Sequence, residues 1–134
     1  MPKIPIDECP AGPAMDMAVA EALGWHIEFW QDGADGGCEL CDEEGNHVRP
    51  WSYDPSPRWR WSPSTDIAAA WEFAPGILNG KHLVFMGTHW AIWHFDGYDN
   101  MPNDAVGETA PLTICRALLK ANGVEHMEVP GDGD

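Results

Sequence analysis

The chain has 134 residues, and its 22 Asp and Glu against 7 Lys and Arg give a formal net charge of −15 at pH 7. This balance excludes a protein whose whole surface binds nucleic acid, because a phosphate-binding surface must be positive. Hydrophobic residues make up 44% of the chain, with 8 Trp, which is enough for the core of one domain and excludes wholesale disorder.

The first third of the chain predicts an arm, a helix and a strand. Residues 1–13 contain prolines at positions 2, 5, 10 and 13 and predict an irregular arm. Apolar residues at helical spacing predict a short helix over 15–23, which ends at Gly24. Alternating apolar residues over 25–31 then predict a strand.

The next segment is acidic and then rich in proline. Residues 32–47 contain several Gly, Asp and Glu and predict a solvated hairpin loop, which leads into a second strand near 47–53. Prolines at 50, 55, 57 and 63 exclude a regular element over most of 50–63, so we expect a loop there that its tryptophans hold.

A second helix is predicted over 66–74, with Ser64 or Thr65 as its N-cap and Pro75-Gly76 at its end. Ile67, Ala70, Trp71 and Ala74 recur at helical spacing, and we expect them to form its buried face.

Residues 81–86 and 89–95 give the clearest local pattern, because they flank Gly87-Thr88, a two-residue hairpin turn. That turn pairs Val84 with Ala91 and Phe85 with Trp90, and both faces of the hairpin are apolar enough to predict cover on both sides.

After a loop over 96–108, Thr109 and Pro111 predict the start of a well-buried last helix, which Asn122-Gly123 ends. The element order predicts an α+β fold: a single-domain α-β-β-α-β-β-α sandwich whose antiparallel sheet is covered by helices. We expect an irregular N-terminal arm over 1–14, the sandwich domain over 15–123 with both unusual loops inside 32–63, and a flexible acidic tail over 124–134.

Two helical segments carry a family resemblance. Residues 64–72 (STDIAAAWE) and 108–121 (ETAPLTICRALLKA), with Leu23-Gly24-Trp25 after the first helix, resemble the phage ABA-sandwich domain, a family of small proteins of tailed phages and prophages. The resemblance implies a helix–sheet–helix fold and a phage accessory protein in the cytoplasm of a bacterial host. It implies no activity and no functional residues.

Arginine and tryptophan cluster between residues 49 and 61, where Asp54 is the only carboxylate. Indole rings can stack on a base, guanidinium groups can hold phosphate, and free N–H groups at the next helix start favour an anion. The predicted ligand-binding residues are Arg49, Trp51, Arg58, Trp59, Arg60, Trp61, Ser64 and Thr65. The alternative is structural: the tryptophans close one end of the sandwich and the arginines pair with nearby carboxylates.

Cys38 and Cys41, with His47 or His26, have part of the spacing of a zinc site, but the second ligand pair of a complete signature is missing. We therefore predict free thiols, no metal and no cofactor. No nucleophile, phosphate-loop or metalloprotease motif is present, so we expect a protein that is not an enzyme.

The sequence thus favours a cytoplasmic binding protein that captures a small anionic, nucleotide-like ligand, such as a signal of bacterial antiphage defence. A first alternative is an acidic inhibitor that mimics nucleic acid and binds a host defence protein. A second is a structural phage component that forms a homo-oligomer. No apolar stretch is as long as the roughly 20 residues of a membrane helix, and we expect neither membrane association nor direct DNA binding.

Overall fold

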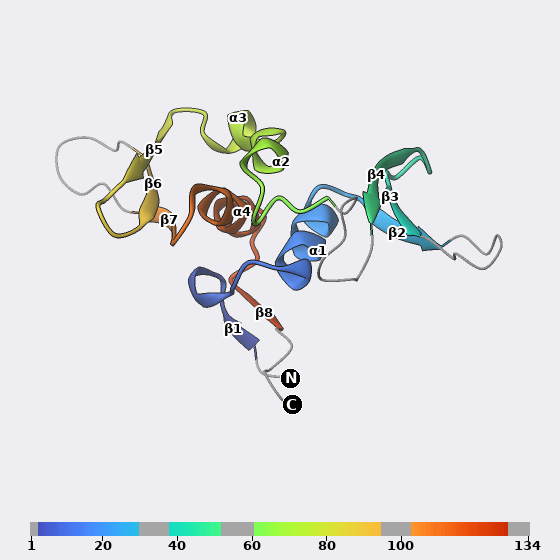
Figure 1. The fold of residues 1–134 in the computed structure, drawn as a ribbon, viewed down its shortest axis with the longest axis horizontal. Helices are drawn as coiled ribbons and strands as arrows, with labels where there is room; N and C mark the ends of the chain where they lie inside the picture. Colours follow the sequence, from blue (N-terminus) through green and yellow to red (C-terminus); the bar gives the residue numbers. More distant parts are fainter. Residues whose placement is uncertain (1–2, 30–37, 52–60, 95–102, 129–134) are drawn as a thin grey trace.

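The computed structural model describes residues 3–29, 38–51, 61–94 and 103–128 (Figure 1). It confirms the α+β class: short helices combine with antiparallel sheets in one small unit. No helix in these ranges is long and apolar enough to cross a membrane.

The last helix, α4 (Ala110–Ala121), is buried, as predicted from its apolar pattern, and it lies at the centre of the fold. Thr109 caps it by accepting a hydrogen bond from the Leu112 N–H at 3.3 Å, and Gly123, with φ of +84°, follows its end. Every side chain from Leu112 to Leu119 is buried, so this helix joins two clusters of core residues.

A three-stranded sheet packs on one side of α4. It consists of β5 (Lys81–Phe85), β6 (Trp90–His94) and β7 (Asn103–Gly107), in the order β5-β6-β7. The β5–β6 register is the predicted one, with Val84 opposite Ala91 and Phe85 opposite Trp90. β7 was not predicted, because its sequence, NDAVG, has no hydrophobic alternation and becomes a strand only through its pairing with β6.

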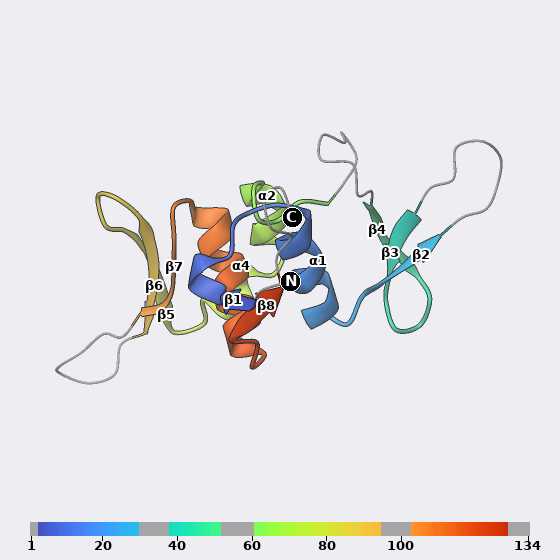
Figure 2. The same cartoon turned by 90° about the horizontal axis from the view of Figure 1, so that it is seen from below.

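A second three-stranded sheet lies at the other end of the molecule (Figures 1 and 2). Its strands are β2 (His26–Phe29), β3 (Cys38–Cys41) and β4 (His47–Trp51), paired in chain order. β2 and β4 were predicted, but β3 lies inside the segment that was expected to be an acidic loop. Leu40 in this strand is fully buried and packs in the core. The acidic residues around it in the sequence made this apolar position hard to recognise.

The α+β class is thus as predicted, but the arrangement of the strands differs from the predicted single sheet between helical layers. Among the described residues the strands form three separate sheets, and Figure 2 shows the helices between the two larger ones. In both larger sheets, strands pair with their neighbours along the chain. The apolar rows of α4 lie between these two sheets and do not cover one face of a single continuous sheet.

Two short strands near the chain ends pair with each other, inside segments that were expected to be an irregular arm and a flexible tail; residues 129–134 of the expected tail lie outside the described residues. β1 (Lys3–Pro5) runs antiparallel to β8 (His126–Glu128), with Ile4 opposite Met127, and both of these side chains pack on the core. The 3₁₀ helix η1 (Ile6–Glu8) follows β1 and buries Ile6.

Arg116 holds this N-terminal segment to the core. Its guanidinium is almost completely buried, and it donates to the Cys9 carbonyl through Nε at 3.1 Å and through Nη2, and to the Val106 carbonyl at 2.8 Å. Burial lowers the pKa of Arg116, because a charged group loses hydration inside the protein. Nearby, Lys120 forms an ion pair with Asp7 at 2.8 Å on the surface.

Three helices complete the fold: α1 (Pro13–Ala22), α2 (Ile67–Trp71) and α3 (Ala74–Ile77). The predicted cap of α2 is wrong, since Asp66 caps the helix by accepting from the Ala68 N–H at 3.0 Å. The predicted buried face is also half wrong. Ala70 and Ala74 are fully buried, but Ile67 and Trp71 are 47% and 51% exposed, because the small alanine side chains form the contact with α4 and turn the larger ones outward.

Candidate functional site: an acidic pocket beside a half-buried tryptophan

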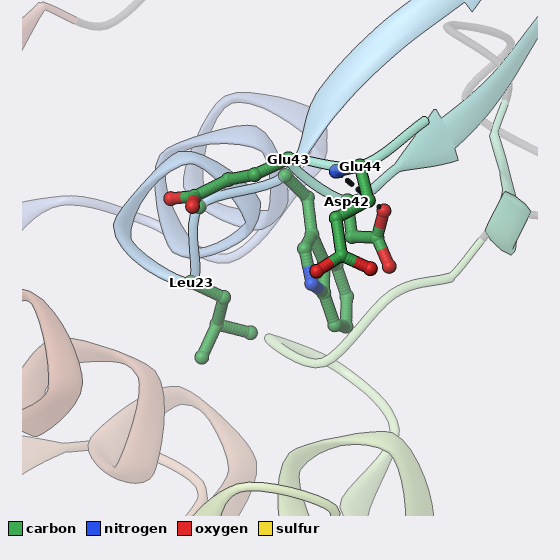
Figure 3. Close-up of a pocket in the computed structure, with 6 residues that line it drawn as sticks. Leu23, Asp42, Glu43 and Glu44 are labelled. Atoms are coloured by element: carbon green, nitrogen blue, oxygen red, sulfur yellow. Dashed lines mark hydrogen bonds between the residues drawn. The ribbon is translucent and has the colours of Figure 1, made fainter. Parts of the chain in front are cut away.

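A pocket of about 320 Å³ lies between the end of α1 and the turn that joins β3 to β4. Leu23, Gly24 and Trp25 line it from the α1 side, and Asp42–Glu44 line it from the turn. Figure 3 shows the Glu43 side chain extending toward the segment that follows α1, away from the side chains of Asp42 and Glu44.

The end of α1 has a helix-terminating hydrogen-bond pattern that fixes one wall of the pocket. Trp25 N–H donates to the Ala20 carbonyl at 2.9 Å, and Gly24 N–H donates to the Glu21 carbonyl at 3.0 Å. Gly24 has φ of +86°, a conformation that glycine adopts without strain. The negative end of the α1 dipole therefore lies at this wall.

The opposite wall is a turn that Asp42 organises. Its Oδ1 accepts the N–H groups of Glu44 and Asn46, both at 2.9 Å, and its Oδ2 accepts from the Asn46 amide at 3.3 Å. The hydrogen bond from the Asn46 backbone is the main cause of the lowered pKa of Asp42. Asp42 thus keeps its negative charge to a lower pH than a free aspartate.

Glu43 brings a second carboxylate close to the helix end. A Cβ placed on Gly24 would lie 3.0 Å from the Glu43 Oε1, so any other residue at position 24 would push this side chain away. Carboxylates and the negative end of a helix repel one another, and none of the described residues that line the pocket is basic. The arrangement attracts cationic groups, and the Trp25 indole beside it adds an aromatic wall suited to an ammonium or guanidinium group.

The pocket belongs to a wider acidic surface. Among the side chains that the structure describes, Lys3 is the only exposed lysine or arginine, since Lys81 and Lys120 are half-buried and Arg116 is buried. By contrast, ten of the described residues have exposed carboxylates: Glu8, Glu21, Glu28, Glu43, Glu44, Asp66, Glu72, Glu108, Glu125 and Glu128.

Trp61, one of the predicted ligand-binding residues, lies in the core. It is 6% exposed, its ring centroid lies 4.9 Å from that of Trp25 and 6.1 Å from that of Phe73, and its Nε1 donates to Glu72 at 2.8 Å. Both the ring and the polar atom of Trp61 therefore have partners inside the protein.

Ser64 and Thr65 also make internal hydrogen bonds. Ser64 is fully buried; its N–H donates to the buried Asp16 carboxylate at 2.8 Å, and its Oγ accepts from Gly12 N–H at 2.9 Å. These bonds join the start of α1 to the segment before α2. Thr65 is exposed, and its hydroxyl donates to the Ser62 carbonyl at 3.4 Å. The expected anion site at the helix start is taken by the Asp66 carboxylate.

The other predicted ligand-binding residues are not placed in the same detail. Arg58, Trp59 and Arg60 lie outside the described residues, and of Arg49 and Trp51 the structure describes the backbone positions in β4. These five residues stay a prediction.

The cysteines that suggested part of a zinc site occupy β3. Cys41 is fully buried, and its backbone lies opposite both His26 and His47 in the two neighbouring strands. No group of three or more ligands for a metal ion forms among the described side chains, which do not include those of Cys38 and His47. Cys115 is a core thiol, as predicted, and burial raises its pKa.

Sequence reasoning missed the acidic pocket because it assigned Asp42–Glu44 to a solvated loop. The signal was present in Asp42-Glu-Glu-Gly45-Asn46, where a turn-forming aspartate precedes a glycine by three residues. What the sequence could not indicate is that this turn lies beside the end of α1.

Comparison with known proteins adds no assignment: no protein-family model matches the chain, and no curated protein shows significant sequence similarity to it. The resemblance to the phage ABA-sandwich domain stays a prediction.

Proposed function

We propose that this protein is a non-catalytic binding protein whose ordered acidic surface binds a basic partner protein. The observation that carries the proposal is the pocket in which Asp42 and Glu43 lie beside the negative end of α1, with no basic residue among the described side chains that line it. A lysine or arginine side chain of a partner would relieve this repulsion.

The wider charge distribution supports the same role. A net charge of −15 on a body of 134 residues creates a long-range field that accelerates association with a basic protein. The Asp42 carboxylate in the β3–β4 turn is held by hydrogen bonds, so fewer of its conformations are lost when a partner binds. The phage resemblance is consistent with a partner from an infected bacterium, and we propose that binding inhibits this partner.

The test is binding of a synthetic lysine- and arginine-rich peptide, measured by calorimetry, with an acidic peptide of equal length as a negative control. The double variant Glu43→Gln/Glu44→Gln is expected to weaken binding at least about fivefold, which corresponds to about 1 kcal/mol. Asp42 is left intact because it organises the turn.

The matched control is Glu125→Gln/Glu128→Gln, which removes the same charge at exposed positions away from the pocket. We expect less than about a twofold change for it at about 0.15 M salt, where distant charges are screened. Equal weakening by both double variants would mean that bulk charge alone attracts the peptide. Binding that does not respond to salt would contradict an electrostatic mechanism altogether.

A second candidate function is capture of a nucleotide-like anion by the segment that carries Arg58, Trp59 and Arg60. The observation in its favour is that Trp61, the residue that follows this segment in the chain, is fixed in the core beside Trp25. Trp61 and Ser64 have internal partners and are not included in this candidate site.

This second candidate predicts quenching of tryptophan fluorescence when mono-, di- or cyclic nucleotides are added. Arg58→Ala/Arg60→Ala is expected to weaken nucleotide binding at least about tenfold, or about 1.4 kcal/mol, because two phosphate contacts are lost. Lys3→Ala serves as the control for loss of a surface cation, with no expected change. Unaltered affinity in the double arginine variant would remove these residues from the site.

A further inference from the structure

One edge of the sheet on α4 has backbone groups that have no partner among the described residues. Met86 N–H donates to the His89 carbonyl at 2.8 Å. Because every second residue of an antiparallel strand faces the same neighbour, the backbone groups of Val84 and His82 also face β6. The N–H and carbonyl groups of Leu83 and Phe85 therefore point away from β6. No described strand lies on that side of β5.

The opposite edge of the same sheet is closed by side chains. Val106 in β7 points its backbone groups away from β6, and there the Asp7 carboxylate accepts its N–H at 3.4 Å while Arg116 donates to its carbonyl at 2.8 Å. Folded proteins usually block sheet edges in some such way, because an open edge pairs with another strand. β5 has no comparable cap on Leu83 or Phe85 among the contacts of the described residues.

The open edge is also apolar and free of negative charge. Phe85 is 55% exposed and Met86 is 40% exposed at the end of the hairpin. Residues 73–95 contain no Asp or Glu, although the whole chain has 22 of them. Two copies with a net charge of −15 each repel one another over most of their surface, and this hairpin is a stretch where they can meet without opposing carboxylates.

We propose that the β5 edge binds the β5 edge of a second copy of this chain, so that two three-stranded sheets join into one continuous antiparallel sheet across a two-fold axis. With the axis at Val84, Leu83 exchanges its two backbone hydrogen bonds with the partner's Phe85, and Phe85 exchanges its own with the partner's Leu83. The cross-strand pairs are then Leu83 with Phe85 on one face and Val84 with Val84 on the other, which are all apolar.

The first measurement is the molar mass in solution, by light scattering or sedimentation, from low micromolar to near-millimolar concentrations of the full chain. We expect a concentration-dependent dimer that becomes more populated as salt rises, because screening weakens the repulsion between the two acidic bodies. A wild-type protein that stays monomeric over the whole range would overturn the proposal. So would a partner peptide of another sequence that binds this edge while the chain itself does not dimerise.

Two variants locate the interface. Phe85→Pro removes an N–H that makes no bond inside the sheet, and Phe85→Lys places a charge at the edge; both are expected to give monomers. Trp71→Lys is the matched control, since Trp71 is similarly exposed on α2 but lies off the edge, and it should leave the dimer intact. A dimer that persists in both Phe85 variants would exclude the edge as the interface.

Hydrogen exchange of single amides gives a readout that is independent of mutation. In the monomer the Leu83 and Phe85 amides should exchange quickly, whereas the Val84 amide, which faces β6, is protected. At dimer-forming concentrations the Leu83 and Phe85 amides should become at least about tenfold more protected. Protection of these two amides that does not change with concentration would contradict the proposed pairing.

Discussion

Replacement of Arg116 by methionine should lower the free energy of unfolding by about 2 to 4 kcal/mol. The variant keeps the length and apolar part of the side chain but leaves the carbonyls of buried Cys9 and half-buried Val106 without the donors that Arg116 supplies. Each unsatisfied buried acceptor costs about 1 to 3 kcal/mol. Release of the buried charge offsets part of this loss, because burial already disfavours the ionised guanidinium, as its lowered pKa indicates.

Urea denaturation followed by tryptophan fluorescence measures this loss. Lys120→Met is the control on the same helix: it breaks the ion pair with Asp7, which is about one-third exposed on both sides, and should cost less than about 1 kcal/mol. If the two variants were equally stable, the hydrogen bonds of Arg116 would contribute no more than a surface ion pair. The N-terminal segment would then be held by its apolar contacts.

Gly107→Ala is expected to lower the free energy of unfolding by about 2 to 3 kcal/mol. A Cβ on Gly107 would lie 2.5 Å from the Thr113 Oγ1 and 3.1 Å from the Thr113 backbone nitrogen. A side chain could rotate away, but the backbone of α4 cannot move without disturbing the core on its other side. β7 and α4 would therefore separate.

Thermal unfolding checks this prediction, with an expected fall of about 5 to 10 °C in the melting temperature. Gly76→Ala is the matched control, because a Cβ there meets nothing within 4 Å, and it should leave stability unchanged or raise it slightly. Thr113→Ala in the Gly107→Ala background should restore part of the loss by removing the nearest atom. An unchanged melting temperature for Gly107→Ala would mean that β7 and α4 do not approach this closely.

The elements that could be predicted are those whose signals are contained within the element. Thr109 and Gly123 delimit α4, and Gly87-Thr88 sets the register of β5 with β6, because a cap or a tight turn depends on only a few neighbouring residues. The apolar rows of α4 likewise predicted that this helix would be buried.

The candidate site could be predicted only in part for the same reason. The sequence placed tryptophan and arginine between 49 and 61, but the position of Trp61 in the core depends on Trp25 and Phe73, which are distant along the chain. The acidic pocket depends on the approach of the β3–β4 turn to the end of α1, which neither segment encodes alone. Local patterns also favoured Ser64 as a helix cap, whereas its partners are Asp16 and Gly12.

The amino-acid sequence by itself determined the α+β class, the central buried helix, the β5–β6 hairpin and the strong negative charge. Only the tertiary structure decided that β1 pairs with β8, that Arg116 closes the β7 edge while no described strand of the chain pairs with the β5 edge, and that carboxylates meet the end of α1. The physical reason is the range of the interactions. Caps, turns and periodicity act over a few residues, whereas strand pairing between chain ends, burial of a charged group and electrostatic repulsion at a pocket depend on segments that folding brings together.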